Sequence, residues 1–216
     1  MITAVVFDLD GVLIQTEEIW DDVRGRYIVD QGGRYDADAQ RAMMGMSSKE
    51  WSRFLAEDLG VPRTAAQVNQ DVIELMAAEY REHLPLIDGA VEAVERLAAE
   101  FTLGVASSSN RELIDLAVEI AGLERFFEAT VSSEEVERGK PAPDVYLEAC
   151  RRVGVEPARA AAVEDSHAGI AAAKAAGMRV IALPNPSYPP GDEALAQADL
   201  VLGSLPDLRG DAVRSG

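Results

Sequence analysis

Short runs of apolar residues recur along the chain and are separated by segments with helical periodicity. The first run, Thr3–Phe7, is mostly apolar and partly β-branched, which is typical of a strand buried on both faces. Similar runs follow at residues 102–106, 129–131, 160–163 and 179–183. Strands that alternate with helices in this way predict an α/β fold with a doubly wound parallel sheet.

One long stretch interrupts this alternation and shows helical periodicity without a convincing strand. Two capping boxes mark helix starts within it, one from Ser47 to Glu50 and one from Thr64 to Gln67. The sequence therefore predicts two parts, an α/β core of residues 1–14 and 86–216 and an all-helical insert of residues 15–85.

Composition and charge narrow the class of protein. The 216 residues include 20 Lys and Arg against 38 Asp and Glu, a formal net charge of −18 that opposes binding to nucleic acid or to an anionic membrane. A single cysteine excludes an intramolecular disulfide, and no apolar run approaches the ~20 residues of a membrane span. The first residues lack the basic start of a signal peptide, so we expect a cytoplasmic protein.

Polar side chains follow the predicted strands at the points where the strands end. Asp8 and Asp10 come after the first strand, Ser107 to Asn110 after the second, and Glu164 with Asp165 after the fourth. Lys140, one of three lysines, precedes a further predicted helix. Because ligands of open parallel sheets bind at the carboxyl ends of the strands, we expect these groups to converge at one edge.

The acidic members of this set predict a metal site. Asp8 and Asp10 are two residues apart, so in an extended segment their side chains point the same way. Glu164 and Asp165 would bring two more carboxylates into the same volume, where mutual repulsion raises pKa values unless a cation is present. Ligands that are all hard oxygens favour Mg²⁺ over zinc or copper.

The serine-rich segment predicts an anion site. The spacing of Ser109 and Glu112 is that of a capping box, so a helix is expected to begin there. A helix start offers free backbone N–H groups, and Ser107 with the amide of Ser108 would face the same cleft as Asp8. The ammonium group of Lys140 could hold a phosphoryl oxygen and offset the carboxylates.

Together these segments resemble the four motifs of the haloacid dehalogenase superfamily. The string from Phe7 to Leu13 looks like its first motif, and Ser107, Lys140 and the string from Val163 to Ser166 match the others in order. The resemblance covers essentially the whole chain and is nearest to the β-phosphoglucomutase and sugar-phosphate phosphatase subgroup. It implies a Rossmann-like core with an inserted helical cap.

The resemblance also implies a role for each motif residue. Asp8 would be the nucleophile that forms an aspartyl-phosphate, and Asp10 the general acid and base. Ser107, Ser108 and Lys140 would hold the phosphoryl group. Phosphoryl transfer depends mainly on positioning and charge neutralisation, which fits this set of residues.

The expected cofactor is Mg²⁺. The resemblance implies that Asp8, the backbone carbonyl of Asp10 and Asp165 bind it, with Glu164 contributing directly or through water. Dehalogenases need neither the second aspartate nor a metal, so Asp10 and the Glu164–Asp165 pair argue against that reaction.

The predicted reaction is Mg²⁺-dependent hydrolysis of a small phosphomonoester, with a sugar phosphate as first candidate. A mutase is the main alternative, although Trp20 and Gln15 stand where mutases usually have His and Asp. A phosphonate hydrolase would use Lys49 as an imine former, but those enzymes usually have a small residue in place of Asp10. A non-enzymatic phosphate-binding module would be expected to lack a catalytic group.

Within the insert, the candidates for substrate contact are Thr16, Trp20, Ser48 and Lys49. Trp20 and Trp51 fit packing of the insert and could also line a substrate cavity. The expected partner is a small phosphorylated metabolite, with no nucleic acid or membrane, and the chain could be a monomer or a homodimer.

Overall fold

The core of the molecule is a six-stranded sheet in which all neighbouring strands are parallel, in the order β3-β2-β1-β4-β5-β6. The computed structural model describes residues 1–43, 46–186 and 189–214. The strands are β1 (Ala4–Phe7), β2 (Thr102–Ser107), β3 (Phe127–Ser132), β4 (Ala160–Glu164), β5 (Arg179–Ala182) and β6 (Leu200–Val201). The predicted doubly wound α/β fold is confirmed.

The predicted strands are all present, with shifted ends and one addition. β3 begins at Phe127, two residues before the predicted run. β6 was not predicted, because its two residues, paired with β5, are too short to show a periodicity of their own.

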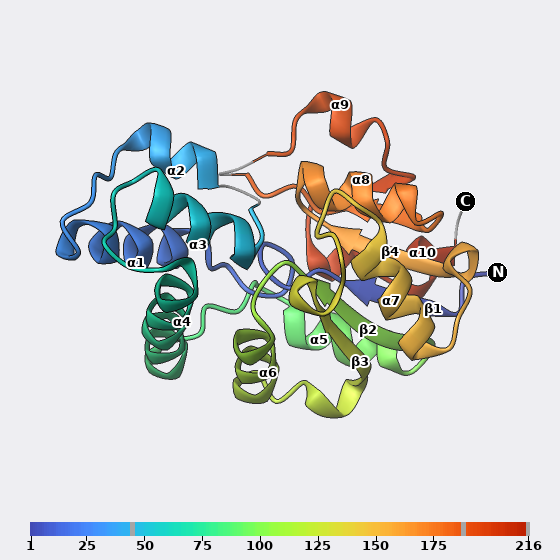
Figure 1. Cartoon of the computed structure of the whole chain (residues 1–216). Coiled ribbons are helices and arrows are strands. Elements are labelled where there is room, and N and C mark those ends of the chain that lie inside the picture. Colours follow the sequence, from blue (N-terminus) through green and yellow to red (C-terminus); the bar gives the residue numbers. More distant parts are fainter. Residues whose placement is uncertain (44–45, 187–188, 215–216) are drawn as a thin grey trace.

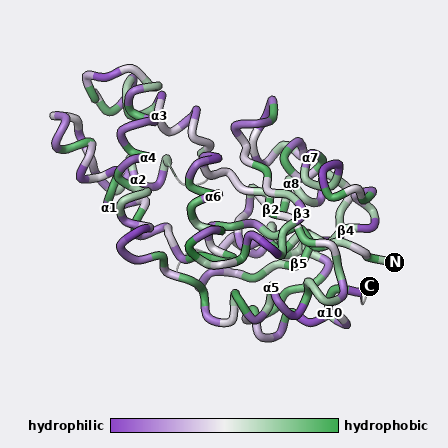
Figure 2. Tube along the Cα trace, turned by 90° about the horizontal axis from the view of Figure 1, so that it is seen from below, coloured by the Kyte–Doolittle hydropathy of each residue, from purple (hydrophilic) through white to green (hydrophobic). Residues whose placement is uncertain are grey.

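Helices cover both faces of the sheet (Figure 1). Those of the core are α5 (Ala90–Ala98), α6 (Arg111–Ile120), α7 (Asp144–Val153), α8 (His167–Ala175), α9 (Asp192–Leu195) and α10 (Gly210–Arg214). Val5 and Phe7 of β1 belong to a cluster that includes α5 and α6, whereas Ala4 and Val6 belong to a cluster that includes α7 and α8. Successive side chains of a strand point to opposite faces, so each of these residues is buried. Figure 2 shows the strands as hydrophobic segments inside more hydrophilic surroundings.

Between β1 and α5 the described residues form four helices and no named strand. They are α1 (Glu17–Asp30), α2 (Ala37–Met43), α3 (Ser48–Glu57) and α4 (Ala65–Glu82). Both predicted capping boxes form, at Ser47 with Glu50 and at Thr64 with Gln67. In Figure 1 the four helices lie together to one side of the sheet.

The two chain segments that lead into and out of these helices run side by side. The amide of Gln15 donates to the carbonyl of Pro85, at 2.8 Å, and the amide of Ile87 donates to that of Leu13, at 3.0 Å. Ile14 and Leu86 form an isolated antiparallel bridge. The two segments thus form a paired crossing at the predicted boundaries of the helical insert, near residues 15 and 85.

Among the described residues, no helix is long and apolar enough to cross a membrane.

Candidate active site

The loop after β1 turns tightly and places Asp8 and Asp10 at the carboxyl end of the sheet. The carbonyl of Leu9 accepts hydrogen bonds from the amides of Leu13 and Ile14, and Gly11 has a φ of 85°. A Cβ atom at Gly11 would lie 2.0 Å from Oδ2 of Asp165. Glycine is therefore required both by the left-handed backbone and by the close approach of Asp165, which arrives from the end of β4.

Lys140 lies between two carboxylates. Its Nζ is 2.6 Å from Oδ1 of Asp8 and 2.6 Å from Oε1 of Glu164, and all three side chains are buried. Burial alone would lower the pKa of Lys140, but the charges of Asp8 and Glu164 outweigh burial and raise it, so the side chain is an ammonium ion. The three residues come from segments that are distant in sequence, and they converge as the sequence predicted.

Glu164 is fully buried and its two oxygens are surrounded by donors. Oε1 accepts from Lys140 and from the hydroxyl of Tyr146 at 2.7 Å. Oε2 accepts from the amides of Asp165 and Ser166 at 3.1 and 3.3 Å and from the hydroxyl of Ser166 at 3.1 Å. A Cβ at Gly169 would lie 1.8 Å from Oε1, so α8 also packs closely against this carboxylate. These contacts favour a role for Glu164 in orienting Lys140.

Asp8, Glu164 and Asp165 form a buried acidic cluster whose ligand atoms lie within 4.8 Å of one another. Burial raises the pKa of Asp8 to about 8, even though Lys140 opposes the shift. Burial, followed by the charges of Glu164 and Asp8, also raises the pKa of Asp165. Crowded hard-oxygen donors of this kind fit a divalent cation, which would relieve their repulsion.

The carboxylate of Asp10 is held by three hydroxyl groups. Thr16 donates to Oδ1. Ser109 and Ser107 donate to Oδ2, at 2.7 and 3.4 Å. Thr16, a predicted substrate contact, has no exposed surface, and its hydroxyl donates to Asp10.

The capping box predicted at Ser109 is wrong. The N-cap of α6 is Asn110, and its side chain makes no capping hydrogen bond. Instead, Glu134 from the segment after β3 accepts from the amide of Arg111 at 2.9 Å and from the side-chain amide of Asn110 at 2.7 Å. The spacing of Ser109 and Glu112 is right for a box, but the hydroxyl of Ser109 is recruited by Asp10, a partner distant in sequence.

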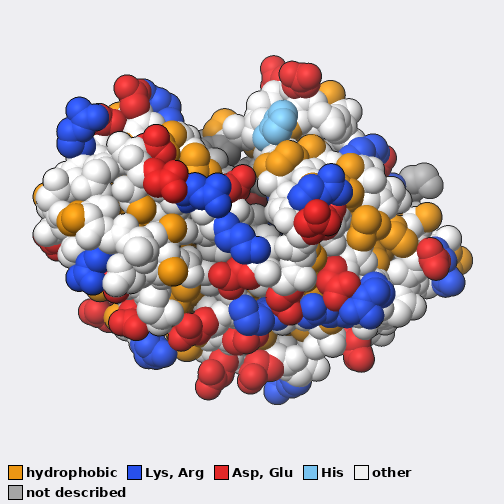
Figure 3. Space-filling view, in the orientation of Figure 1, with side chains coloured by type: hydrophobic (Ala, Val, Ile, Leu, Met, Phe, Trp, Pro, Cys, Tyr) orange, Lys and Arg blue, Asp and Glu red, His pale blue; other side chains and the backbone are white. Residues whose placement is uncertain are grey.

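A cavity of about 500 Å³ joins these groups to the helices α1 to α3. Its lining includes Ser108, Lys140 and Asp165 from the core and Trp20 and Trp51 from α1 and α3. Side chains from α1 to α3 and from the sheet's loops both contribute, and the space-filling view shows a notch between the corresponding parts of the molecule (Figure 3).

Two predicted substrate contacts lie elsewhere. Ser48 and Lys49 do not line this cavity but a second one of about 390 Å³, which runs beside Lys140. The hydroxyl of Ser48 donates to Glu134 at 3.3 Å. Sequence reasoning could not separate the two cavities, because both are bordered by the same short segment before α3.

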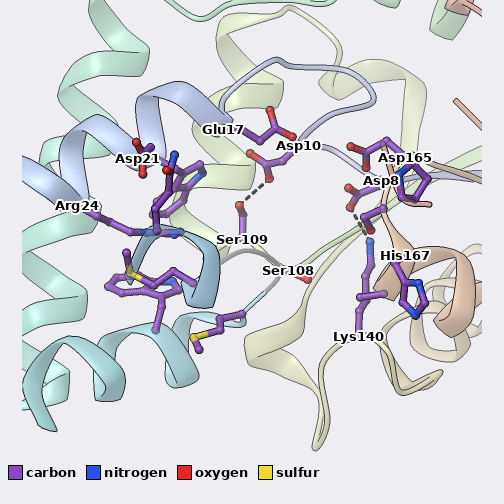
Figure 4. A pocket seen from close by; sticks show the side chains of 18 of the residues that line it. Asp8, Asp10, Glu17, Asp21, Arg24, Ser108, Ser109, Lys140, Asp165 and His167 are labelled. Atoms are coloured by element: carbon purple, nitrogen blue, oxygen red, sulfur yellow. Dashed lines mark hydrogen bonds and ion pairs between the residues drawn. The ribbon is translucent and has the colours of Figure 1, made fainter. Parts of the chain in front are cut away.

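Sequence reasoning missed three charged residues of the first cavity, Glu17, Asp21 and Arg24. They recur at the spacing of one helix face, a signal visible in the sequence. Figure 4 shows Asp21 and Arg24 at the end away from Asp8 and Lys140, with Glu17 beside Asp10 between them.

Comparison with known proteins assigns the family. The sequence model of the haloacid dehalogenase-like hydrolases matches residues 5–183. The chain belongs to this family. The expected family and the expected enzyme class, a hydrolase of this type, are therefore confirmed.

Several curated relatives of this hydrolase are named as phosphatases. It is 33% identical to hexitol phosphatase B of Escherichia coli K12, with 96% of this chain and 94% of the relative covered. It is 32% identical to validoxylamine A 7'-phosphate phosphatase of Streptomyces hygroscopicus, with 97% of both covered. It also matches a bifunctional riboflavin kinase/FMN phosphatase of Arabidopsis thaliana at 32% identity, but there it spans 54% of the relative's length and 96% of its own.

Among solved structures, CbbY of Rhodobacter sphaeroides in complex with phosphate superposes with a TM-score of 0.86. The two chains are 29% identical, and the match covers 96% of each. Because the match covers nearly the whole of both chains, it includes the sheet as well as the helices α1 to α4.

Proposed function

We propose that this hydrolase is a Mg²⁺-dependent phosphatase that cleaves a small phosphomonoester through an aspartyl-phosphate on Asp8. The observation that carries the proposal is the convergence of Asp8, Asp10, Lys140 and Asp165 at one end of a cavity large enough for a metabolite. A nucleophile, a second carboxylate, a buried cation and a cluster of metal-binding donors are the parts that phosphoryl transfer requires.

In the first step, an oxygen of Asp8 forms a bond to phosphorus while the bond from phosphorus to the ester oxygen breaks. Asp10 donates a proton to the departing alcohol and becomes a carboxylate. In the second step, Asp10 takes a proton from a water molecule, whose oxygen attacks phosphorus and releases Asp8 with inorganic phosphate. Ser109, Ser107 and Thr16 orient Asp10 for both transfers through the hydrogen bonds that they donate.

Lys140 positions the phosphoryl group. Its ammonium ion lies 2.6 Å from Asp8 and is oriented by Glu164, so it can bind an oxygen of the group that Asp8 attacks. Ser108 lines the cavity at the same end. Ser107 is almost fully buried and accepts from the amide of Ser109 at 3.0 Å, so its contribution is to fix the loop as well as Asp10.

Asp8, Asp165 and the backbone carbonyl of Asp10 would hold the Mg²⁺ ion. When bound, the ion neutralises the charge of the phosphoryl oxygens and of the nucleophile. The oxygens of Glu164 already accept five hydrogen bonds, so Glu164 would act through Lys140 or through water.

The relatives and the cavity support a proposal for the substrate class. Hexitol phosphatase B and validoxylamine A 7'-phosphate phosphatase are named for phosphates of polyhydroxylated molecules. We therefore propose a sugar phosphate or a related polyol phosphate. Residues 15–85 would form a cap that covers this substrate, with the paired crossing at Gln15 and Pro85 as the hinge.

The alternatives have weaker support. Trp20 lines the cavity, and it stands at the position where mutases of the β-phosphoglucomutase subgroup usually have His. Lys49 does not line that cavity, which disfavours the imine of a phosphonate hydrolase.

The test is phosphate release from a panel of phosphomonoesters, with Mg²⁺ and with chelator, by the native protein and by Asp8→Asn. We expect turnover that requires Mg²⁺ and falls about a thousandfold or more in Asp8→Asn. A matched control is Asp115→Asn, an exposed aspartate of α6 paired with Arg111. Absence of phosphate release from every ester, or equal release by Asp8→Asn, would contradict the proposal, and isomerisation of glucose 1-phosphate would support the mutase.

A further inference from the structure

One face of α1 lines the cavity from beside Asp10 to the end away from Lys140. Glu17, Asp21 and Arg24 occupy positions i, i+4 and i+7 and all line the cavity, with Trp20 beside them. None of these three charged side chains contributes to the chemical steps proposed above. Figure 4 shows the Arg24 side chain reaching across this end of the cavity near Asp21.

Arg24 is held by aromatic rings. Its guanidinium carbon lies 4.4 Å from the ring centroid of Trp20 and 5.2 Å from that of Trp51. No ion pair or hydrogen bond of the Arg24 side chain is found within the described part of the chain, and its buried Nε has no acceptor. Burial lowers the pKa of Arg24 to about 10, which leaves it charged at neutral pH. A cation that is fixed in place but lacks acceptors is prepared for acceptors on a ligand.

The two carboxylates beside it are each half-engaged. The side-chain amide of Gln15 donates to Oε2 of Glu17 at 2.7 Å, and the hydroxyl of Tyr35 donates to Oδ1 of Asp21. Among the described residues, none donates a hydrogen bond to Oδ2 of Asp21, and the carboxylate of Glu17 also interacts with its own backbone amide. Each carboxylate has further acceptor positions that donors on a ligand can use.

Groups of both signs along one face of a cavity discriminate between ligand chemistries. A hydroxyl group donates to a carboxylate and accepts from a guanidinium, so adjacent hydroxyls satisfy all three side chains. A second phosphate or carboxylate would meet Arg24 but would be repelled by Glu17 and Asp21. An apolar body would leave the guanidinium of Arg24 without acceptors, which is costly. The rings of Trp20 and Trp51 add apolar surface for the C–H groups of a carbohydrate.

We propose that Glu17, Asp21 and Arg24 bind the hydroxyl groups of the substrate, so that the substrate is a monophosphate whose remaining part is an uncharged polyol or sugar. This inference rests on the proposed phosphatase activity and assigns its specificity to the α1 face.

The test compares Arg24→Gln with Arg26→Gln. Arg26 is an exposed residue of the same helix that pairs with Asp22 and Glu79, and it serves as the matched control. Steady-state kinetics with Mg²⁺ would use a hexitol phosphate, a deoxy analogue of it, a hexose bisphosphate and p-nitrophenyl phosphate. For the hexitol phosphate we expect kcat/KM to fall about 10- to 100-fold in Arg24→Gln and to change less than about twofold in Arg26→Gln.

The other substrates separate the possible outcomes. For p-nitrophenyl phosphate, kcat/KM should fall by a smaller factor than for the hexitol phosphate in Arg24→Gln, because that ester presents no hydroxyl groups to α1. If the bisphosphate is preferred and loses most in Arg24→Gln, the ligand group is an anion and the inference is wrong. If no ester is hydrolysed by the native protein, the proposed function fails instead.

A binding measurement tests the same contacts without turnover of the substrate. Calorimetric titration of hexitol phosphate into Asp8→Asn, with and without Arg24→Gln, should show about 10-fold or more weaker binding in the double variant. If Arg24→Gln does not fold, as judged by its thermal unfolding, Asp21→Asn replaces it with the same expectation. Equal affinity in these variants overturns the inference.

Discussion

At the scale of single residues, the active site depends on contacts that leave no room for alternatives. Gly11 lets the Asp165 carboxylate approach the backbone after β1, and Gly169 does the same for Glu164. Both contacts lie beside the acidic cluster, so a single methyl group at either position would displace a carboxylate.

Gly11→Ala should therefore weaken metal binding in addition to lowering the free energy of unfolding. Gly177→Ala is the matched control, because Gly177 has a φ of 79° and open space around its Cβ position, whereas Gly11 has a φ of 85° and Asp165 in that position. Both changes should cost about 1 kcal/mol in unfolding free energy for the left-handed backbone. Only Gly11→Ala should weaken Mg²⁺ binding, about 10-fold or more by calorimetry, and equal Mg²⁺ affinity in the two variants would contradict this.

A second residue-scale prediction concerns the hydroxyl of Tyr146. It donates to the buried Glu164 at 2.7 Å, whereas the hydroxyl of Tyr27 donates to the partly exposed Asp71 at the same distance. Tyr146→Phe should lower the free energy of unfolding by about 1–3 kcal/mol, and Tyr27→Phe by less than about 1 kcal/mol, because the first leaves a buried charge with one donor fewer. Urea denaturation measures both, and a larger loss in Tyr27→Phe would count against the argument.

At the scale of elements, the capping-box spacing leads to different contacts at two of the predicted helix starts. Thr64 caps α4, with its side chain accepting from the amide of Gln67 at 3.3 Å. Ser109 precedes α6 but donates to Asp10, and Glu134 takes over at the start of that helix. The same local spacing thus serves stability in one helix and the active site in the other.

Alanine substitutions should separate these two roles. Thr64→Ala should cost about 1 kcal/mol of stability through the lost cap and leave phosphatase kcat unchanged. Ser109→Ala should reduce kcat about 10-fold, since Asp10 loses its shortest hydrogen bond to Oδ2. Unchanged turnover in Ser109→Ala would show that the Asp10 carboxylate needs no such support.

At the scale of the whole molecule, the site joins distant parts of the chain. The cavity is built from the segments that follow β1, β2 and β4 and the segment before α7 on one side, and from α1 to α3 on the other. The acidic cluster draws together β1 and β4, which pair in the centre of the sheet. A cation bound there should therefore stabilise the fold as a whole.

Metal binding should raise the melting temperature. At Mg²⁺ about 100-fold above its Kd, the expected stabilisation is about 2.7 kcal/mol, or roughly 5–10 °C in Tm. Chelator should reverse the shift, and Asp165→Asn should abolish it. A shift of the same size in Asp165→Asn would place the ion elsewhere.

The sequence alone determined the fold class, the helical character of residues 15–85 and the set of motif residues at the strand ends. These follow from local properties: the periodicity of apolar residues, capping spacings and the rule that parallel strands present their carboxyl ends together. Tertiary structure alone decided which group each polar side chain meets. Glu164 contacts Lys140, Ser109 contacts Asp10, and Arg24 rather than Lys49 lines the cavity. Such choices depend on the packing of distant segments, which brings competing partners within hydrogen-bonding distance, and no local pattern records that competition.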